Sequence, residues 1–337
     1  MIMSKLFSPL SKHLFFSTIP RISLRREFRF RAFVRRFCEK KNETERTYAE
    51  AQKQSLKERA MGPPGPNAYA MGKGAMAGGA IIGLLALCYY GIGMGQEKGN
   101  VMNKSKLWPK YVHERIRSTY AYLGGSVMIS AISSFLVFNT PPLLFLVTRT
   151  GILSVLATTA AIIASGYVAQ TLPYEEGLGL KQLAWMGHCV IMGAAIAPMC
   201  FLGGPVMIRA AMYTGGIVGG LSAVAICAPS DKFLYMGGPL AIGLGLLIAA
   251  SLASLWLPPT TAIGAGISSF TLYGGLLIFS GFLLYDTQRI IYTAENHPIV
   301  SNHKFDPISA AISVYMDILN IFIRMAVILS GDQGKRR

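Results

Sequence analysis

Hydrophobic positions recur along the chain in long runs, separated by short polar connections. A helix needs ~20 apolar residues to cross the ~30 Å hydrocarbon core of a bilayer. Seven runs meet this length: about 74–94, 119–138, 150–170, 182–202, 206–227, 236–256 and 264–285. An eighth, about 308–329, is apolar except for Asp317, Asn320 and Arg324, and it either spans fully or dips into the bilayer and returns. The pattern predicts an all-α, polytopic membrane helix bundle with no extramembrane domain.

Composition supports this prediction. Hydrophobic residues make up 52% of the chain and charged residues only 14%, whereas soluble proteins carry about 25% charged residues. Many of the 36 glycines lie inside the apolar runs, several of them four residues apart. This spacing allows helices to approach closely in lipid, so tight bundling is expected.

The first part of the chain is basic and has a different character. Residues 1–41 hold eleven Lys and Arg against two acids, a net charge of +9, with serines and apolar residues interleaved. This is typical of a mitochondrial transit peptide, with a basic tail that touches anionic lipid as the alternative. Residues 42–73 form a charged and then Pro/Gly-rich linker, and residues 332–337 a basic tail. Targeting and membrane loops account for the overall charge of +16 better than nucleic acid does.

The basic connections do not fix the orientation in the membrane. Segment 95–118 carries more basic residues than any other connection: Lys98, Lys104, Lys106, Lys110, Arg115 and Arg117. The positive-inside bias would put it on the matrix face of a mitochondrial inner membrane. Segment 39–73 and the C-terminal tail are basic too, and eight full spans would place both on the opposite face. Both orientations therefore remain open.

Two carboxylates, Asp286 and Asp317, lie inside long apolar stretches. The other acids after Gly72, Asp306 among them, fall in polar connections or at the end of the chain. A charged residue at membrane depth costs roughly 2.5–3.5 kcal/mol on insertion scales, so it tends to persist where it is functional. Only one connection separates the two segments, which favours adjacent helices and a carboxyl pair that shares a proton. When deprotonated, the pair offers oxygen ligands suited to Ca²⁺, bound transiently. The alternatives are an interfacial salt bridge from Asp286 to Arg289 and a purely structural hydrogen bond at Asp317.

Other polar residues within the apolar runs are candidates for supporting roles. Asn320 and Arg324 follow Asp317 on the same helix at spacings of three and seven residues. Arg149 and Arg209 each begin a span, where snorkelling to headgroups is the default and gating the alternative. His188 is either a pH sensor or a satisfied structural histidine. No nucleophile triad, nucleotide loop, haem motif or zinc-type histidine spacing is present, so the chain is not expected to be an enzyme and no cofactor is predicted.

Several motifs carry a family resemblance. The segments Leu283-Leu-Tyr-Asp-Thr-Gln288 and Ser313-Val-Tyr-Met-Asp-Ile-Leu-Asn-Ile-Phe322 resemble the signature of the transmembrane Bax-inhibitor-motif family. Further segments are similar to its mitochondrial branch: Arg117–Leu123, Gly203–Ala211, Tyr213–Ser222, Cys227–Ser230 and Leu257–Thr261. The resemblance covers about residues 113–331.

The resemblance implies a Bax-inhibitor-type core of seven helices with the last helix at its centre, preceded here by an extra transmembrane helix at 74–94. It also implies that Asp286 and Asp317 form a proton-sharing pair that gates Ca²⁺. The mitochondrial branch is linked to Ca²⁺/H⁺ exchange across the inner membrane, to cristae organisation and apoptosis control, and to cytochrome c and a membrane AAA protease as partners. A basic latch on the pair, as in some relatives, has no secure position here, and Arg149 is the candidate.

The leading hypothesis is a multi-pass protein of the mitochondrial inner membrane that conducts Ca²⁺ under the control of protons. Calcium ions and protons would be its transported ions, by exchange or by leak. The rival is a scaffold that transports nothing and that organises cristae or restrains a membrane AAA protease. A proton leak without Ca²⁺ is a third reading.

Overall fold

A computed structural model describes residues 66–93, 108–148, 151–175, 179–228, 233–258, 260–298 and 304–333, together with residues 62 and 177. The predicted transit peptide, most of the linker, Arg149 and the last four residues of the basic tail lie outside this part of the chain. The described helices are α3 (Pro66–Gly93), α5 (Lys110–Asn139), α6 (Pro141–Thr148), α7 (Ile152–Thr171), α8 (Leu180–Ile196), α9 (Gly204–Cys227), α10 (Gly237–Ala253), α11 (Ala262–Ser269), α12 (Gly275–Asn296) and α13 (Pro307–Gln333). Shorter helical turns are η1 (Ala197–Leu202), η2 (Leu234–Met236) and η3 (Phe270–Gly274).

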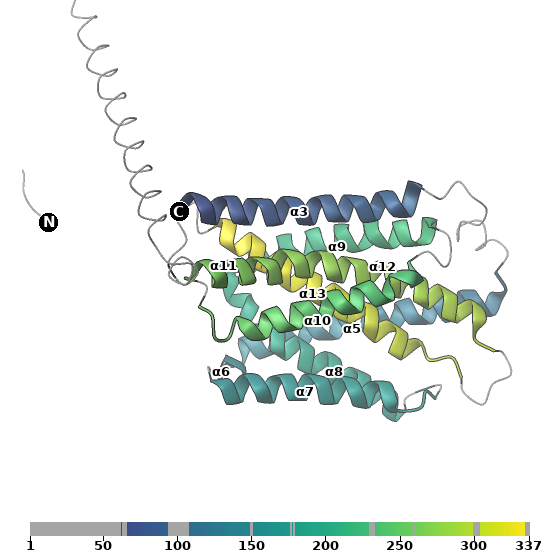
Figure 1. The fold of residues 1–337 in the computed structure, drawn as a ribbon. Helices are drawn as coiled ribbons and strands as arrows, with labels where there is room; N and C mark the ends of the chain where they lie inside the picture. Colours follow the sequence, from purple (N-terminus) through teal and green to yellow (C-terminus); the bar gives the residue numbers. More distant parts are fainter. Residues whose placement is uncertain are drawn as a thin grey trace, which may run out of the picture. The chain divides into compact units, whose positions relative to one another are not determined.

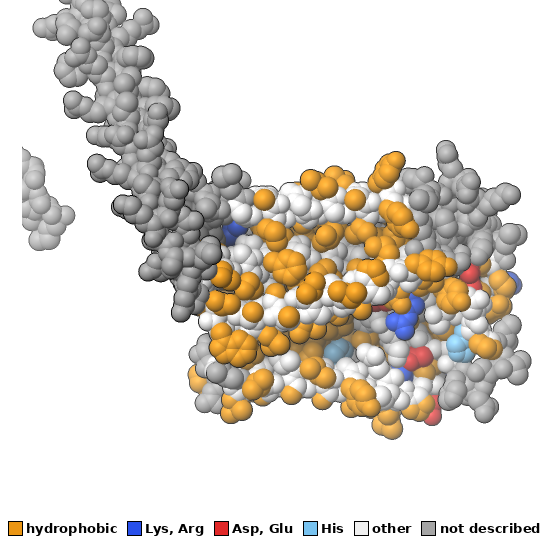
Figure 2. Space-filling view, viewed as in Figure 1, with side chains coloured by type: hydrophobic (Ala, Val, Ile, Leu, Met, Phe, Trp, Pro, Cys, Tyr) orange, Lys and Arg blue, Asp and Glu red, His pale blue; other side chains and the backbone are white. Residues whose placement is uncertain are grey.

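Eight helical segments within the described residues are long and apolar enough to cross a membrane. They run side by side in Figure 1, with α3 along one edge and α7 along the opposite edge. Figure 2 shows hydrophobic side chains spread along the helices, while most of the charged side chains in view gather toward one end. The all-α membrane bundle predicted from the sequence, with one span before the seven-helix core, is confirmed.

The last helix, α13, lies at the centre of the bundle. One apolar cluster joins it to α9 and α12, through residues such as Leu221, Leu283 and Ile321. A second cluster joins it to α5, α7 and α8, through residues such as Cys189 and Tyr315. Since α13 contributes to both clusters, its side chains are screened from lipid on most sides. Polar groups on α13 are therefore surrounded mainly by other helices.

The structure settles three points that the hydrophobic pattern left open or missed. The final run does not dip and return, because α13 is one continuous helix of 27 residues. Segment 95–118 is not all connection, because α5 begins at Lys110 and carries Arg115 and Arg117 in its first turns. The short helix α6 was not predicted, because its 8 residues are too few to register as a span.

The seventh span is interrupted by a wide turn. Helices α11 and α12 form one segment, Ala262–Asn296, and the π-helical turn η3 lies between them. Turns of this kind inside α-helices are rare and are frequent at functional sites. The turn shifts backbone carbonyls out of the regular ladder, and the carbonyl of Thr271 accepts a hydrogen bond from Arg324 on α13.

Candidate functional site

The packing of α12 against α13 brings Asp286 and Asp317 together. Both residues are buried, at 8% and 5% exposure. Their carboxyl groups lie close enough to interact directly, at a separation into which a hydrogen bond between them would fit. Two carboxyl groups can form such a bond only if one of them carries a proton, because two carboxylates in contact repel each other. The closeness of the two groups allows a shared proton, and the proton-sharing pair itself stays a prediction.

Among the described residues, the two carboxyl groups have few other hydrogen-bond or ion-pair partners. Oδ2 of Asp317 is buried and has no hydrogen-bond partner. Nη1 of Arg289 lies 4.0 Å from Oδ1 of Asp286, at the limit of an ion pair, and the Arg289 side chain is 60% exposed. The predicted Asp286–Arg289 contact therefore exists but is weak, as exposed pairs generally are. The contact between Asp286 and Asp317 is therefore the main interaction of the two carboxyl groups.

A cavity of about 220 Å³ leads to Asp286. It is lined mainly by polar side chains and by two carboxylates, and the lining residues are Gln170, Asp286, Arg289, Ile290, Thr293, Asp306, Ser309, Ala310 and Ser313. Hydroxyl and carboxylate oxygens are the groups that replace the water shell of a hard cation. Within the described residues no three His, Cys, Asp or Glu side chains group closely enough to hold a metal ion.

The sequence reasoning missed Asp306, which lies at the rim of this cavity. It precedes Pro307 and caps α13: Oδ1 accepts from the backbone N–H groups of Ile308 (3.1 Å) and Ser309 (3.2 Å). The hydroxyl of Ser309 donates to Oδ2. The signal was present in the sequence, since an acidic residue followed by proline is a typical helix start. The sequence pattern instead placed Asp306 in a polar connection.

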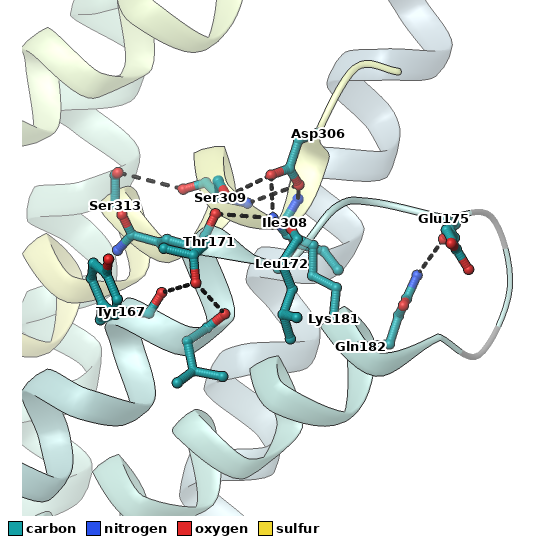
Figure 3. A network of polar contacts seen from close by, with 12 residues as sticks. Tyr167, Thr171, Leu172, Glu175, Lys181, Gln182, Asp306, Ile308, Ser309 and Ser313 are labelled. Carbon is teal, nitrogen blue, oxygen red and sulfur yellow. Dashed lines mark hydrogen bonds and ion pairs between the residues drawn. The ribbon is translucent and has the colours of Figure 1, made fainter. Parts of the chain in front are cut away.

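Lys181 was also missed, and it holds Asp306 in place. Its side chain is only 2% exposed, and Nζ lies 2.6 Å from Oδ2 of Asp306. The same ammonium donates to the carbonyls of Leu172 (2.7 Å) and Gln170 (3.4 Å) at the end of α7. Figure 3 shows this side chain reaching from the start of α8 toward Asp306. One cation thus fastens the α7–α8 connection to the first turn of α13, beside the cavity.

His188 lies in a polar region where α5, α7, α8 and α13 meet, and not at the carboxyl pair. Nδ1 is 2.9 Å from the Ser165 hydroxyl, and the ring stands edge-on to Tyr315. The Tyr315 hydroxyl forms a short hydrogen bond with Ser130, which also donates to the carbonyl of Cys189. Nε2 of His188 is buried without a partner among the described residues. These contacts join α13 to its neighbours through Tyr315. The two predictions for His188, a pH sensor and a structural histidine, both stay predictions.

The remaining candidates separate into two groups. Arg324 bonds to Asn320, with Nη1 at 3.0 Å from Oδ1, so these two interact with each other. Arg209 is exposed on α9 near the start of that span, where an arginine can snorkel to the headgroups as expected.

Within the signature segment, Gln288 has a structural role. Its side chain accepts from the N–H of Phe233 (2.7 Å) and donates to the carbonyl of Ala225 (3.3 Å).

Comparison with known proteins agrees with this architecture. The family model described as "Inhibitor of apoptosis-promoting Bax1" matches residues 112–334. A rat protein named growth hormone-inducible transmembrane protein is 48% identical over 87% of this chain and 85% of its own length. An uncharacterized membrane protein of Vibrio cholerae is 30% identical over 64% of this chain and 87% of its own. Rice Bax inhibitor 1 is 31% identical over 43% of this chain and 55% of its own.

A central apolar helix, a buried carboxyl pair and eight spans define a polytopic membrane protein with a polar site inside its bundle. The chain belongs to the family of the inhibitor of apoptosis-promoting Bax1. The match begins at the start of α5 and ends at the end of α13, so α3 stands outside it.

Proposed function

We propose that this chain is a pH-regulated Ca²⁺ pathway of the mitochondrial inner membrane, with Asp286 and Asp317 as its proton-sensing gate. The observation that carries the proposal is the burial of these two carboxyl groups next to each other, on α12 and α13. A pair of this kind exists in two charge states whose packing differs. The similarity of the chain to Bax inhibitor proteins supports the same proposal.

In the closed state one proton bridges the pair and holds α12 against α13. Loss of that proton as the pH rises leaves two negative charges in contact, and their repulsion drives the helices apart. The exposed oxygens then attract a divalent cation from the cavity beside Asp286. Return of a proton expels the cation and closes the gate. Charged groups near the pair are Arg289 on α12 and, across the cavity, Asp306 with its partner Lys181.

Placement in the mitochondrial inner membrane is supported by the basic, serine-containing leader at residues 1–41. The proposal predicts that a reporter fused to residues 1–41 is imported into mitochondria. Replacing the arginines of this segment with glutamine should abolish import, as measured by protease protection in isolated mitochondria. Import of the glutamine variant would contradict the assignment.

Transport is tested with the full chain reconstituted into liposomes that contain a Ca²⁺ indicator. Flux of the unaltered protein should rise from acidic to mildly alkaline pH. Asp317→Asn should abolish this dependence, because an amide cannot give up the shared proton. Glu114→Gln is the matched control, since Glu114 is an exposed carboxylate on α5. Equal flux for Asp317→Asn and unaltered protein at every pH would refute the gate.

The same liposomes separate exchange from leak. A pH indicator inside the liposomes records proton movement. An exchanger exports protons in proportion to the Ca²⁺ that enters, so the internal pH rises. A Ca²⁺ leak exports no protons in exchange, and with the membrane potential clamped the internal pH stays constant. A proton current that persists without Ca²⁺ identifies the third reading, a proton leak.

The alternative is a scaffold that organises cristae and contacts cytochrome c or a membrane AAA protease without transporting ions. Helix α3 favours it, because only 6% of the residues in its apolar window are buried inside the bundle and many of the others are exposed. The double substitution Asp286→Asn with Asp317→Asn decides between the two. A scaffold would still restore mitochondrial shape in depleted cells, whereas a transporter would not.

A further inference from the structure

A second cavity lies toward the opposite end of α13 from Asp306. Its volume is about 930 Å³, within the range of pockets that hold small molecules. It is lined by residues of α3, η3 and α13 and of the ends of α10 and α11. The polar members are Lys73, Ser254, Ser268, Ser269, Thr271, Tyr273, Arg324 and Ser330. None of its lining residues is acidic, in contrast to the cavity beside Asp286.

Arg324 is held in this cavity by neutral groups. Nη1 donates to the backbone carbonyl (2.9 Å) and the side-chain oxygen (3.0 Å) of Asn320, and Nε donates to the carbonyl of Thr271. The guanidinium also lies over the ring of Phe279, 4.6 Å from its centroid. The ion pairs found in the described part of the chain join Lys181 to Asp306 and Arg289 to Asp286, and neither includes Arg324. A partly buried cation without a protein anion favours an anionic ligand.

The backbone around Arg324 is shaped to admit the guanidinium. A Cβ at Gly275 would collide with Nε of Arg324, so a larger residue where α12 begins would displace the guanidinium. The wide turn η3 directs the Thr271 carbonyl toward Arg324. The Thr271 hydroxyl is buried and has no partner among the described residues, which leaves a donor beside the cation. Guanidinium and hydroxyl donors together match the oxygens of a phosphate group.

The position of the cavity in the spans points to a lipid source. Lys73 and Gly331 lie at the ends of their apolar spans, where a bilayer around the bundle would have its headgroups. Arg324 is seven residues before Gly331, about 10 Å deeper along the helix axis. Apolar side chains line the space alongside it: Ile323, Val327, Ile328 and Leu329. Basic pockets between membrane helices are known to bind phosphorylated headgroups, and an apolar wall accommodates the attached chains.

We propose that this cavity binds the phosphate group of an anionic phospholipid, with Arg324 as the central ligand and Lys73 and the Thr271 hydroxyl beside it. The site is separate from the carboxyl pair, so it does not depend on the transport proposal. Bound lipid would bridge α3 and α13. Its phosphate would balance the positive charge of Arg324, which also bonds to the Thr271 carbonyl of η3.

The test is native mass spectrometry of the full chain released from detergent, with phosphatidylglycerol titrated against phosphatidylcholine. The unaltered protein should retain phosphatidylglycerol preferentially. Arg324→Gln should weaken retention about tenfold, the effect of losing one charge-assisted contact. Arg209→Gln is the matched control, because Arg209 is an exposed arginine at the start of another span, and its retention should equal that of the unaltered protein.

Gly275→Ala provides a second variant in case Arg324→Gln does not fold. It keeps the arginine but displaces the guanidinium, and weaker retention is again expected. Unchanged retention in whichever of these variants folds would overturn the site. Equal retention of phosphatidylcholine would overturn the requirement for an anionic lipid. If inorganic phosphate, monitored by thermal unfolding, stabilises the protein through Arg324 while phosphatidylglycerol does not, the source is free phosphate and the lipid assignment is wrong.

Discussion

At the scale of single residues, Lys181 forms a buried ion pair whose loss should be costly. Its ammonium is buried and bonds at once to Asp306 and to the last carbonyls of α7. Removing one partner of a buried ion pair leaves the other without compensation. We expect Lys181→Met to lower the free energy of unfolding by about 3 kcal/mol, as measured by thermal unfolding in detergent.

Two further variants test the cause of that loss. Arg289→Met removes an exposed arginine whose pair is at the distance limit, and it should cost less than about 1 kcal/mol. Adding Asp306→Ser to Lys181→Met removes the stranded carboxylate but keeps a side chain that can cap α13, so part of the stability should return. A Lys181→Met protein as stable as the unaltered chain would show that the ion pair is not structural.

The sequence identified Asp286 and Asp317 because carboxylates in apolar runs are conspicuous. It did not identify Lys181 or Asp306, because each lies at the edge of a run, where a charge is unremarkable. Only the cap at Asp306 had a local signal. Its pairing with Lys181 depends on how the α7–α8 connection meets α13, which is a long-range property of the fold.

At the scale of the elements, α5 and α8 cross so closely that glycine is required at the backbone contact. A Cβ at Gly193 would collide with the carbonyl of Ser130 and come within 2.7 Å of the Cβ of Ser133. Serine hydroxyls on α5 bond to carbonyls of α8 at the same crossing, so the helices cannot separate without loss of these bonds. We expect Gly193→Ala to lower the free energy of unfolding by about 1–3 kcal/mol.

Gly187 on the same helix is the control for that prediction. A Cβ there would meet nothing within 4 Å. Gly187→Ala should therefore raise stability by about 0.5–1 kcal/mol, through the better helix propensity of alanine. Thermal unfolding of both variants in one detergent measures the contrast. The same sign for both substitutions would mean that the crossing is not close-packed as described.

Hydrophobic run length predicted the number of spans but misplaced some of their ends. Helix α5 begins at Lys110 and α12 continues to Asn296, beyond the apolar runs that predicted them. Polar turns extend both helices beyond these runs. Arg115 donates to the carbonyls of Ala294 (2.9 Å) and His297 (3.1 Å), so these carbonyls at the end of α12 have a hydrogen-bond donor. Such extensions depend on a neighbouring helix, so hydropathy alone does not reveal them.

For the whole molecule, the number and order of spans fix which connections share a side of the membrane. Ser254 follows α10 and Gly331 lies near the end of α13, and both line the cavity of Arg324. Glu175 lies between α7 and α8, and Asn296 ends α12, near the Lys181–Asp306 pair. Eight crossings place the first two residues on one face of the bilayer and the last two on the other.

This arrangement is tested by single cysteines at those four exposed positions in a chain otherwise free of cysteine. A thiol reagent that cannot cross the membrane, added to sealed vesicles of uniform orientation, should label Ser254→Cys and Gly331→Cys alike. Glu175→Cys and Asn296→Cys should give the opposite result, and detergent should make all four reactive. Labelling of Gly331→Cys together with Asn296→Cys in sealed vesicles would mean that α13 does not cross. The carboxyl pair would then lack the bilayer-spanning helix on which the transport proposal rests.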